Sequence, residues 1–125
     1  MKNMKLIITL MVAALVASCG FDARAELSEA EAREYVKRGV LVIDVRTVEE
    51  FKAKSLTNVV NIPLAEVKDR FPQVVTNKSD VVLLHCRTGR RSGVAESELR
   101  ALGYTNVFNI GSFEKAQKIL GESKK

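Results

Sequence analysis

Nucleophilic chemistry is best supported in this sequence by one six-residue stretch, Cys86-Arg87-Thr88-Gly89-Arg90-Arg91. An apolar run over residues 81–84 leads into it, and a helical pattern over residues 93–102 follows. This order predicts a buried strand, a tight loop and a helix. The loop then lies at a helix N-terminus, where free N–H groups and the helix dipole attract anions. We expect the pKa of Cys86 to be lowered there, because its thiolate is the anion that is stabilised.

The neighbours of this cysteine favour a reactive thiol over an inert one. A buried cysteine at a strand end, beside a solvated basic turn, is the plain alternative. Three arginines in the loop add positive charge, and Gly89 lets the backbone curl around an anion.

The first 25 residues predict an export segment. A charged start precedes an apolar run of 11 residues, Leu6–Val16, which suits a signal-peptide core and is too short to span a bilayer. Two endings compete. Cleavage after Ala25 would leave a soluble product, with residues 1–25 as signal peptide. A lipobox-like stretch ending at Cys19 would instead remove residues 1–18 and leave Cys19 lipidated.

Either ending predicts a protein exported to the periplasm or cell envelope of a bacterium. If the lipobox is used, Gly20 follows the modified cysteine, as in lipoproteins sorted to the outer membrane. The only membrane contact expected is through that lipid. Residues 26–125 then form one domain.

Composition narrows the classes of function. The chain has 125 residues, of which 46% are apolar and 28% charged, with a net charge of +5. That charge is too mild to indicate nucleic acid, and no stretch interleaves aromatic and basic residues. With Cys19 removed or lipidated, Cys86 is a lone thiol that cannot form an internal disulfide. One histidine and one free cysteine also argue against a zinc site, and we expect no metal and no cofactor.

The remaining chain alternates helices with apolar strands. Ser28 with Glu31 and Thr47 with Glu50 form two capping boxes. Alternation of this kind predicts an α/β fold with a mainly parallel central sheet, which binds ligands at the carboxyl ends of its strands. We expect helices over residues 30–38, 48–54, 64–71 (ended by Pro72), 93–102 and 113–120, and strands over 40–43, 59–62, 81–84 and 106–110.

Several short motifs together resemble a single-domain rhodanese (thiosulfate sulfurtransferase), especially the small periplasmic phage-shock-type rhodaneses. The resemblance covers roughly residues 27–115, and the loop that starts at the cysteine is its specific part. The matching residues are Ile43-Asp44-Val45-Arg46, Glu49-Glu50-Phe51, Asn61-Ile62-Pro63, the Cys86 loop with Ser92-Gly93, and Leu102-Gly103-Tyr104.

This resemblance implies a rhodanese-like fold and a site. Cys86 would carry a persulfide, and the loop residues Arg87, Thr88, Gly89, Arg90 and Arg91 would form the cradle that binds substrate. Asp44 and Arg46 match the family's Asp-x-Arg segment near the loop, where the aspartate is expected to brace it. A surface ion pair is the alternative for these two residues. If Asp44 is buried, loop N–H groups or Arg91 could be its donors.

The implied reaction is a two-step sulfur transfer. The thiolate attacks the outer sulfur of thiosulfate, sulfite leaves, and a thiol or cyanide then takes the sulfur from the persulfide. The expected partners are small sulfur-containing anions and thiol acceptors, for example a thioredoxin-like protein.

Two segments depart from the family pattern. Residues 55–59 replace a His-hydrophobic-x-Gly-Ala stretch, and Asn58 can supply the left-handed turn there. Gly111-Ser112 replaces a Gly-Gly pair at the wall of the pocket.

Three other features bear on the chemistry. His85 adjoins Cys86 and should point to the opposite face of the strand, so we expect a structural role for it and not that of a base. A cysteine phosphatase or arsenate reductase would need its anion-binding arginine at position 92, where this chain has Ser92. The remaining alternative is a non-catalytic redox or sulfur-sensing module in which Cys86 only docks a partner.

Overall fold

A computed structural model describes residues 26–121, and both predicted export endings, Cys19 included, lie outside the described residues. Its four strands form one parallel sheet in the order β2-β1-β3-β4. The strands are β1 (Leu41–Asp44), β2 (Val60–Asn61), β3 (Val82–His85) and β4 (Val107–Gly111). This arrangement confirms the predicted α/β fold.

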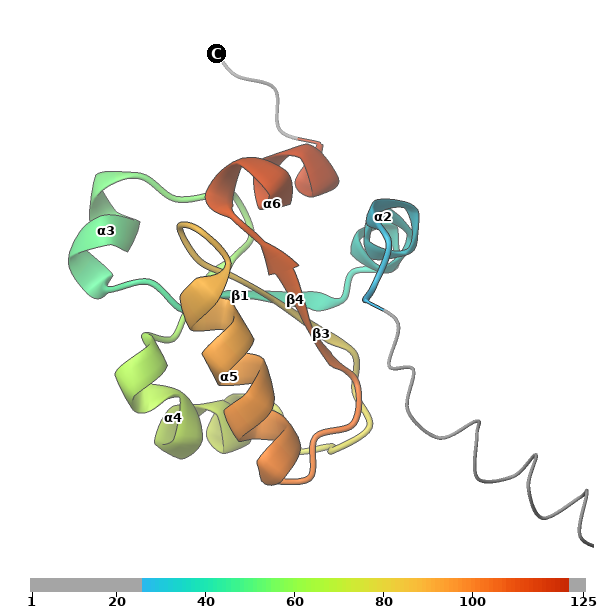
Figure 1. Cartoon of the computed structure of the whole chain (residues 1–125), viewed down its shortest axis with the longest axis vertical. Helices are drawn as coiled ribbons and strands as arrows, with labels where there is room; N and C mark the ends of the chain where they lie inside the picture. The colour runs from blue at the N-terminus through green and yellow to red at the C-terminus, as the bar shows by residue number, and fades with distance from the viewer. Residues whose placement is uncertain (1–25, 122–125) are drawn as a thin grey trace, which may run out of the picture.

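Helices cover both faces of the sheet (Figure 1). On one face lie α2 (Glu29–Lys37) and α6 (Phe113–Leu120), and on the other α4 (Val67–Val74) and α5 (Arg90–Ala101). A short α3 (Val48–Ala53) follows β1, and a 3₁₀ turn, η1 (Leu64–Glu66), precedes α4. None of the helices within residues 26–121 is long and apolar enough to cross a membrane.

Two apolar cores result, one on each face. Phe71, Leu99 and Tyr104 belong to the core beneath α4 and α5, where the two rings pack edge to face with centroids 4.8 Å apart. Leu83 and Phe113 belong to the core beneath α2 and α6. Because β1 and β3 are covered on both faces, their residues form continuous apolar runs and do not alternate with polar ones.

The structure confirms the two predicted capping boxes and the predicted left-handed turn. Ser28 Oγ accepts the Glu31 N–H at 3.1 Å and Thr47 Oγ1 accepts the Glu50 N–H at 3.2 Å, so both capping boxes are present. Asn58 has a φ of +59°, which confirms the left-handed turn.

The boundaries of two helices differ from the prediction. Helix α5 begins at Arg90, three residues before the apolar pattern, because Gly89 at a φ of +96° turns the chain directly into it. Helix α4 continues past Pro72 to Val74. A proline removes one N–H donor, but here Val75 donates to the Phe71 carbonyl at 2.8 Å, and the side chains of Phe71 and Val75 are both buried in the core.

Candidate active site

Cys86 directly follows β3, at the carboxyl edge of the sheet, and its side chain is buried. Its Sγ accepts the Gly89 N–H at 3.0 Å and lies 3.4 Å from the Ser92 hydroxyl. The predicted strand, loop and helix therefore bring backbone and side-chain donors onto the sulfur.

These donors determine the acidity of the thiol. Burial by itself raises the pKa of Cys86, because it disfavours the thiolate. Hydrogen bonds from the side chain and backbone of Ser92, and from the N–H groups of Gly89 and Thr88, outweigh burial and lower the pKa. The predicted direction is confirmed, but the arginines are not among its leading causes.

The Cys86 loop lies against the junction between β4 and α6. Cys86 N–H donates to the Gly111 carbonyl at 3.3 Å, and Phe113 N–H donates to the Arg87 carbonyl at 3.2 Å. Thr88 and Ser112 form an isolated antiparallel bridge. Backbone hydrogen bonds therefore hold the Cys86 loop against the residues that join β4 to α6.

This contact explains which part of the Gly-Gly pattern the chain keeps. Gly111 has a φ of +103°, which favours glycine, and a Cβ on Gly89 would lie 3.2 Å from the Gly111 Cα. Ser112 has a φ of −74°, and its hydroxyl accepts the Lys115 N–H at 3.1 Å as the N-cap of α6. The second position tolerates a side chain, so the substitution leaves this wall intact.

Two polar residues that the sequence did not reveal as a site, Ser92 and Asn109, complete the loop. Asn109 Nδ2 donates to the Gly89 carbonyl at 2.9 Å, and its Oδ1 accepts the Gly111 N–H at 2.9 Å and the Ser92 hydroxyl at 2.7 Å. A polar residue in the otherwise apolar run 107–110 was the available signal for Asn109.

Asp44 and Arg46 form a buried ion pair. Arg46 Nη2 and Nε donate to Asp44 Oδ2 at 2.7 and 2.9 Å, and the Arg46 backbone N–H donates to Oδ1 at 2.8 Å. Their side chains are 0% and 8% exposed, so a surface pair is wrong. Arg46 Nη2 also donates to the Lys54 carbonyl at 2.6 Å, and its guanidinium lies 4.9 Å from the centre of the Phe113 ring.

Arg91 does not meet Asp44, so the predicted bracing through this arginine is wrong. Arg91 Nη1 and Nη2 instead donate to the two Glu50 carboxylate oxygens at 2.6 and 3.0 Å. Because α5 begins at Arg90, Arg91 lies in its first turn and reaches α3, while Arg46 already occupies Asp44.

The Glu50–Arg91 pair shifts both pKa values. The hydrogen bond from Arg91, partly opposed by burial, lowers the pKa of Glu50 from 4.5 to about 2. The same bond raises the pKa of Arg91. Both groups are charged at neutral pH, and the pair joins the loop to α3.

His85 has the predicted structural role. Its ring lies 6.0 Å from the Phe113 ring, on the sheet face opposite Cys86, and Nδ1 lies 3.2 Å from the Cys86 carbonyl oxygen. Burial lowers the pKa of His85 despite the raising effect of Asp44, so the ring is neutral near pH 7. Nδ1–H then donates to that carbonyl. The sulfur receives no contact from this ring.

The remaining loop side chains surround the buried sulfur at the surface. Arg87, Thr88 and Arg90 are exposed, whereas Cys86 is not. Within residues 26–121 no three His, Cys, Asp or Glu side chains gather as metal ligands. The site therefore offers a stabilised thiolate beneath a positively charged rim, which suits attack on an anionic electrophile.

Comparison with known proteins adds independent information. A model of the rhodanese-like domain matches residues 26–118. The chain is 42% identical over 72 residues to thiosulfate sulfurtransferase PspE of Escherichia coli. This match covers 58% of this chain and 69% of that protein. It is 34% identical over 93 residues to thiosulfate sulfurtransferase 18 of Arabidopsis thaliana. That match covers 65% of this chain and 68% of the plant protein.

A solved structure is also similar. The structure described as "rhodanese with anions from E. coli" is 40% identical and superimposes with a TM-score of 0.58. The match covers 60% of this chain and 88% of that one.

Proposed function

Because the chain belongs to the rhodanese-like domain family and is an enzyme of the thiosulfate sulfurtransferase type, we propose that it transfers sulfur through a persulfide on Cys86. Thiosulfate is the proposed donor, and a thiol or cyanide is the proposed acceptor. One observation carries this proposal: the Cys86 sulfur is held by Gly89 N–H and the Ser92 hydroxyl, and within residues 26–121 no histidine or carboxylate forms a hydrogen bond with it. Such an environment stabilises an anionic sulfur both before and after transfer.

In the first step the Cys86 thiolate attacks the outer sulfur of thiosulfate. A bond forms from Sγ to that sulfur, the sulfur–sulfur bond of thiosulfate breaks, and sulfite leaves with the electron pair. Because Cys86 is fully buried, this contact requires a local opening of the structure around the sulfur. The lowered pKa of Cys86 raises the fraction of the thiol that is present as thiolate at a given pH.

In the second step an acceptor thiolate or cyanide attacks the outer sulfur of the persulfide. The bond from that sulfur to Sγ breaks, and Sγ regains the electron pair as a thiolate. The cradle therefore stabilises the leaving group. A thiol on a thioredoxin-like protein is the proposed cellular acceptor.

The exposed arginines at the rim would recognise the donor. Once the outer sulfur of thiosulfate reaches Cys86, its sulfonate end must face the surface, where Arg87 and Arg90 lie. A guanidinium group suits that oxyanion as a hydrogen-bond donor and as a charge.

Phosphoryl chemistry fits this site less well. Ser92 stands where a phosphatase would need its anion-binding arginine, and Arg91 is held by the Glu50 carboxylate. The loop is one residue shorter than a phosphatase signature and suits a single sulfur atom.

The test is mass spectrometry of the purified protein after treatment with thiosulfate. We expect Cys86 to gain one sulfur, about 32 mass units, which a thiol reductant removes. Peptide mapping separates Cys86 from Cys19 if the latter is present. An adduct that persists in Cys86→Ser, or no adduct on the wild type, would overturn the persulfide mechanism. Sulfite release with cyanide as acceptor separates an enzyme from a sensing module.

The site of action proposed for this enzyme is the bacterial periplasm or cell envelope. The charged start and the apolar run Leu6–Val16 support export, and cleavage after Ala25 or lipidation of Cys19 would complete it. The mass of the mature protein from a bacterial host decides between an N-terminal Glu26 and a lipid-bearing Cys19. A protein that retains Met1–Ala25 in the cytoplasm would contradict export.

A further inference from the structure

The Ser92 hydroxyl has one hydrogen and three possible acceptors. Its Oγ lies 2.7 Å from Asn109 Oδ1, 3.2 Å from the Gly89 carbonyl oxygen and 3.4 Å from Cys86 Sγ. Only one acceptor can take the hydrogen at a time. The Asn109 amide oxygen and the sulfur therefore compete for the same donor, and the amide holds the shorter contact.

The orientation of the Asn109 amide is fixed from both sides. Its Nδ2 must donate to the Gly89 carbonyl, and its Oδ1 must accept the Gly111 N–H, so a flipped amide would lose both hydrogen bonds. The oxygen that faces Ser92 is thus always the acceptor.

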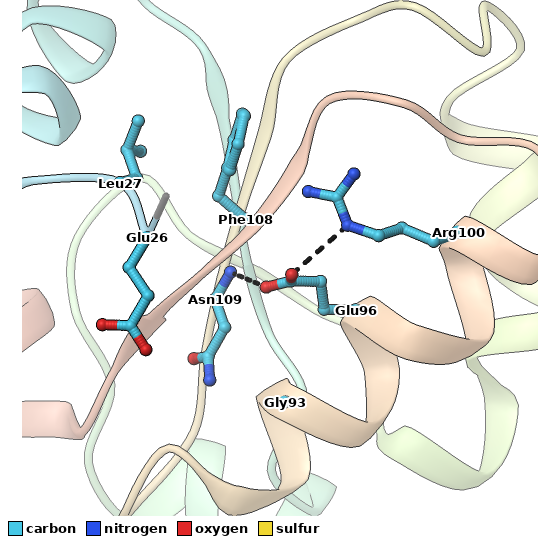
Figure 2. A pocket seen from close by; sticks show the side chains of 7 residues that line it. All are labelled: Glu26, Leu27, Gly93, Glu96, Arg100, Phe108 and Asn109. Atoms are coloured by element: carbon cyan, nitrogen blue, oxygen red, sulfur yellow. Dashed lines mark hydrogen bonds and ion pairs between the residues drawn. The ribbon is translucent and has the colours of Figure 1, made fainter. Parts of the chain in front are cut away.

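The backbone of Asn109 is held from outside the site as well. Its N–H donates to Glu96 Oε2 at 2.6 Å, and Glu96 Oε1 pairs with Arg100 Nε at 3.3 Å. Figure 2 shows these two α5 side chains reaching across to β4, where Asn109 lies beside Gly93. β4 is an edge strand, so no further strand of the described residues pairs with its outer side. On that side the Glu96 carboxylate accepts the Asn109 N–H, as the carbonyl of a neighbouring strand would.

We propose that Asn109 is a positioning residue for the sulfur-transfer reaction, which holds the Ser92 hydroxyl while the sulfur is uncharged and yields it to Cys86 Sγ when the thiolate forms. This inference rests on the proposed function. In the persulfide the negative charge lies on the outer sulfur, and Sγ is a weak acceptor, so the hydroxyl donates to Asn109 Oδ1. When the acceptor takes the outer sulfur, the electron pair of the broken bond goes to Sγ. The hydroxyl then turns to the new anion, and no covalent O–H bond breaks.

The same amide sets a second donor to the sulfur. By holding the Gly89 carbonyl, Asn109 Nδ2 fixes the residue whose N–H donates to Sγ at 3.0 Å. Asn109 itself does not touch the sulfur. It acts through the hydroxyl of Ser92 and the backbone of Gly89.

Asn109→Asp is the sharpest variant, because a carboxylate has the same shape but cannot donate to the Gly89 carbonyl and binds the Ser92 hydrogen more strongly. We expect the pH midpoint of Cys86 thiolate formation, followed by ultraviolet absorbance, to rise. We expect single-turnover transfer from persulfide to a thiol to slow about tenfold, the effect of losing one hydrogen bond to a charged group. Ser92→Ala should shift both in the same direction, and Ser92→Thr should restore them.

Asn106→Ala is the matched control. Asn106 lies immediately before β4, where its side-chain amide donates to the Ser79 carbonyl at 2.8 Å. This variant should leave the thiolate titration and the transfer rate unchanged. If Asn109→Asp does not fold, Asn109→Ser is measured in its place.

An Asn109 variant that lowers the melting temperature but leaves the titration and the transfer rate at wild-type values would overturn the proposal, since that is the outcome of a purely structural role. Effects of Asn109→Asp and Ser92→Ala on transfer that add fully in the double variant would also contradict it, because the Ser92 hydroxyl is a route that the two residues are proposed to share. The titration does not depend on sulfur transfer. A wild type that forms no persulfide would overturn the proposed function, while the titration still tests Asn109.

Discussion

Two arginine–carboxylate pairs near the active site differ in burial and in what they contribute. Arg46 and Asp44 lie at the end of β1 with side chains 8% and 0% exposed, whereas Arg91 and Glu50 join the loop to α3 at 32% and 29%. Both arginines bind their carboxylate through two nitrogen atoms. The chemistry of the two pairs is the same, so the difference between them is one of solvent.

Solvent decides what each pair does. A buried pair has lost the hydration of two charges, so removing one partner leaves the other charge uncompensated. A pair with a third of its surface in water is screened and contributes little to stability. The buried pair therefore supports the carboxyl edge of the sheet, and the exposed pair mainly fixes the direction of the Arg91 side chain.

The largest effect is expected when the buried pair is broken. Arg46→Ala removes the guanidinium from the buried Asp44 carboxylate and leaves it only the backbone N–H of residue 46, so the negative charge is uncompensated. We expect this change to reduce the free energy of unfolding by about 3–5 kcal/mol. Urea unfolding measures this, with Arg33→Ala as the control, since Arg33 forms an exposed pair with Glu29. A loss for Arg46→Ala no larger than that of the control would contradict the comparison.

A much smaller loss is expected when the exposed pair is broken. Arg91→Ala should reduce the free energy of unfolding by less than about 1 kcal/mol, because Glu50 regains water and Asp44 keeps Arg46. Thermal melting of Arg91→Ala and Arg46→Ala under the same conditions checks that the second variant loses more stability than the first. Equal losses of stability would mean that the difference in solvent exposure does not determine how much each pair contributes.

The exposed pair should also give the protein a specific pH dependence. The lowered pKa of Glu50 means that its contribution to stability is fully present above its ordinary value of 4.5 and is lost as the pH falls towards about 2. The difference in stability between wild type and Glu50→Gln should therefore shrink over this interval. A difference that stays constant from pH 5 to about 2 would show that Glu50 is not the titrating group.

The smallest change in stability is expected at the rim. Arg87→Ala and Arg90→Ala remove exposed side chains, so the free energy of unfolding should change by no more than about 0.5 kcal/mol. The KM for thiosulfate should rise nonetheless, because these side chains would face the sulfonate end of the donor. Steady-state kinetics on both variants and Arg91→Ala test the assignment. If Arg91→Ala alone raises the KM, Arg91 leaves Glu50 to bind substrate.

The sequence by itself predicted those features whose causes lie within a few residues. Each capping box joins residues three apart, and the continuous apolar runs of β1 and β3 reflect burial on both faces. The left-handed turn at Asn58 and the cysteine loop before α5 follow from local backbone preferences in the same way. Periodicity and capping act over one or two turns of chain, so they can be read without knowledge of the packing.

Only the tertiary structure decided which charged and polar groups meet. Arg91 and Glu50 are 41 residues apart, and Ser92 and Asn109 are 17 apart. Which carboxylate Arg91 reaches depends on where α3 packs against the loop, and Asn109 reaches Ser92 because β4 lies beneath α5. Likewise, α4 runs past Pro72 because Phe71 and Val75 are both buried in the core. Side-chain hydrogen bonds extend only about 3 Å, so a shift of one helix by a few ångströms exchanges one partner for another, and the packing of whole elements determines that position.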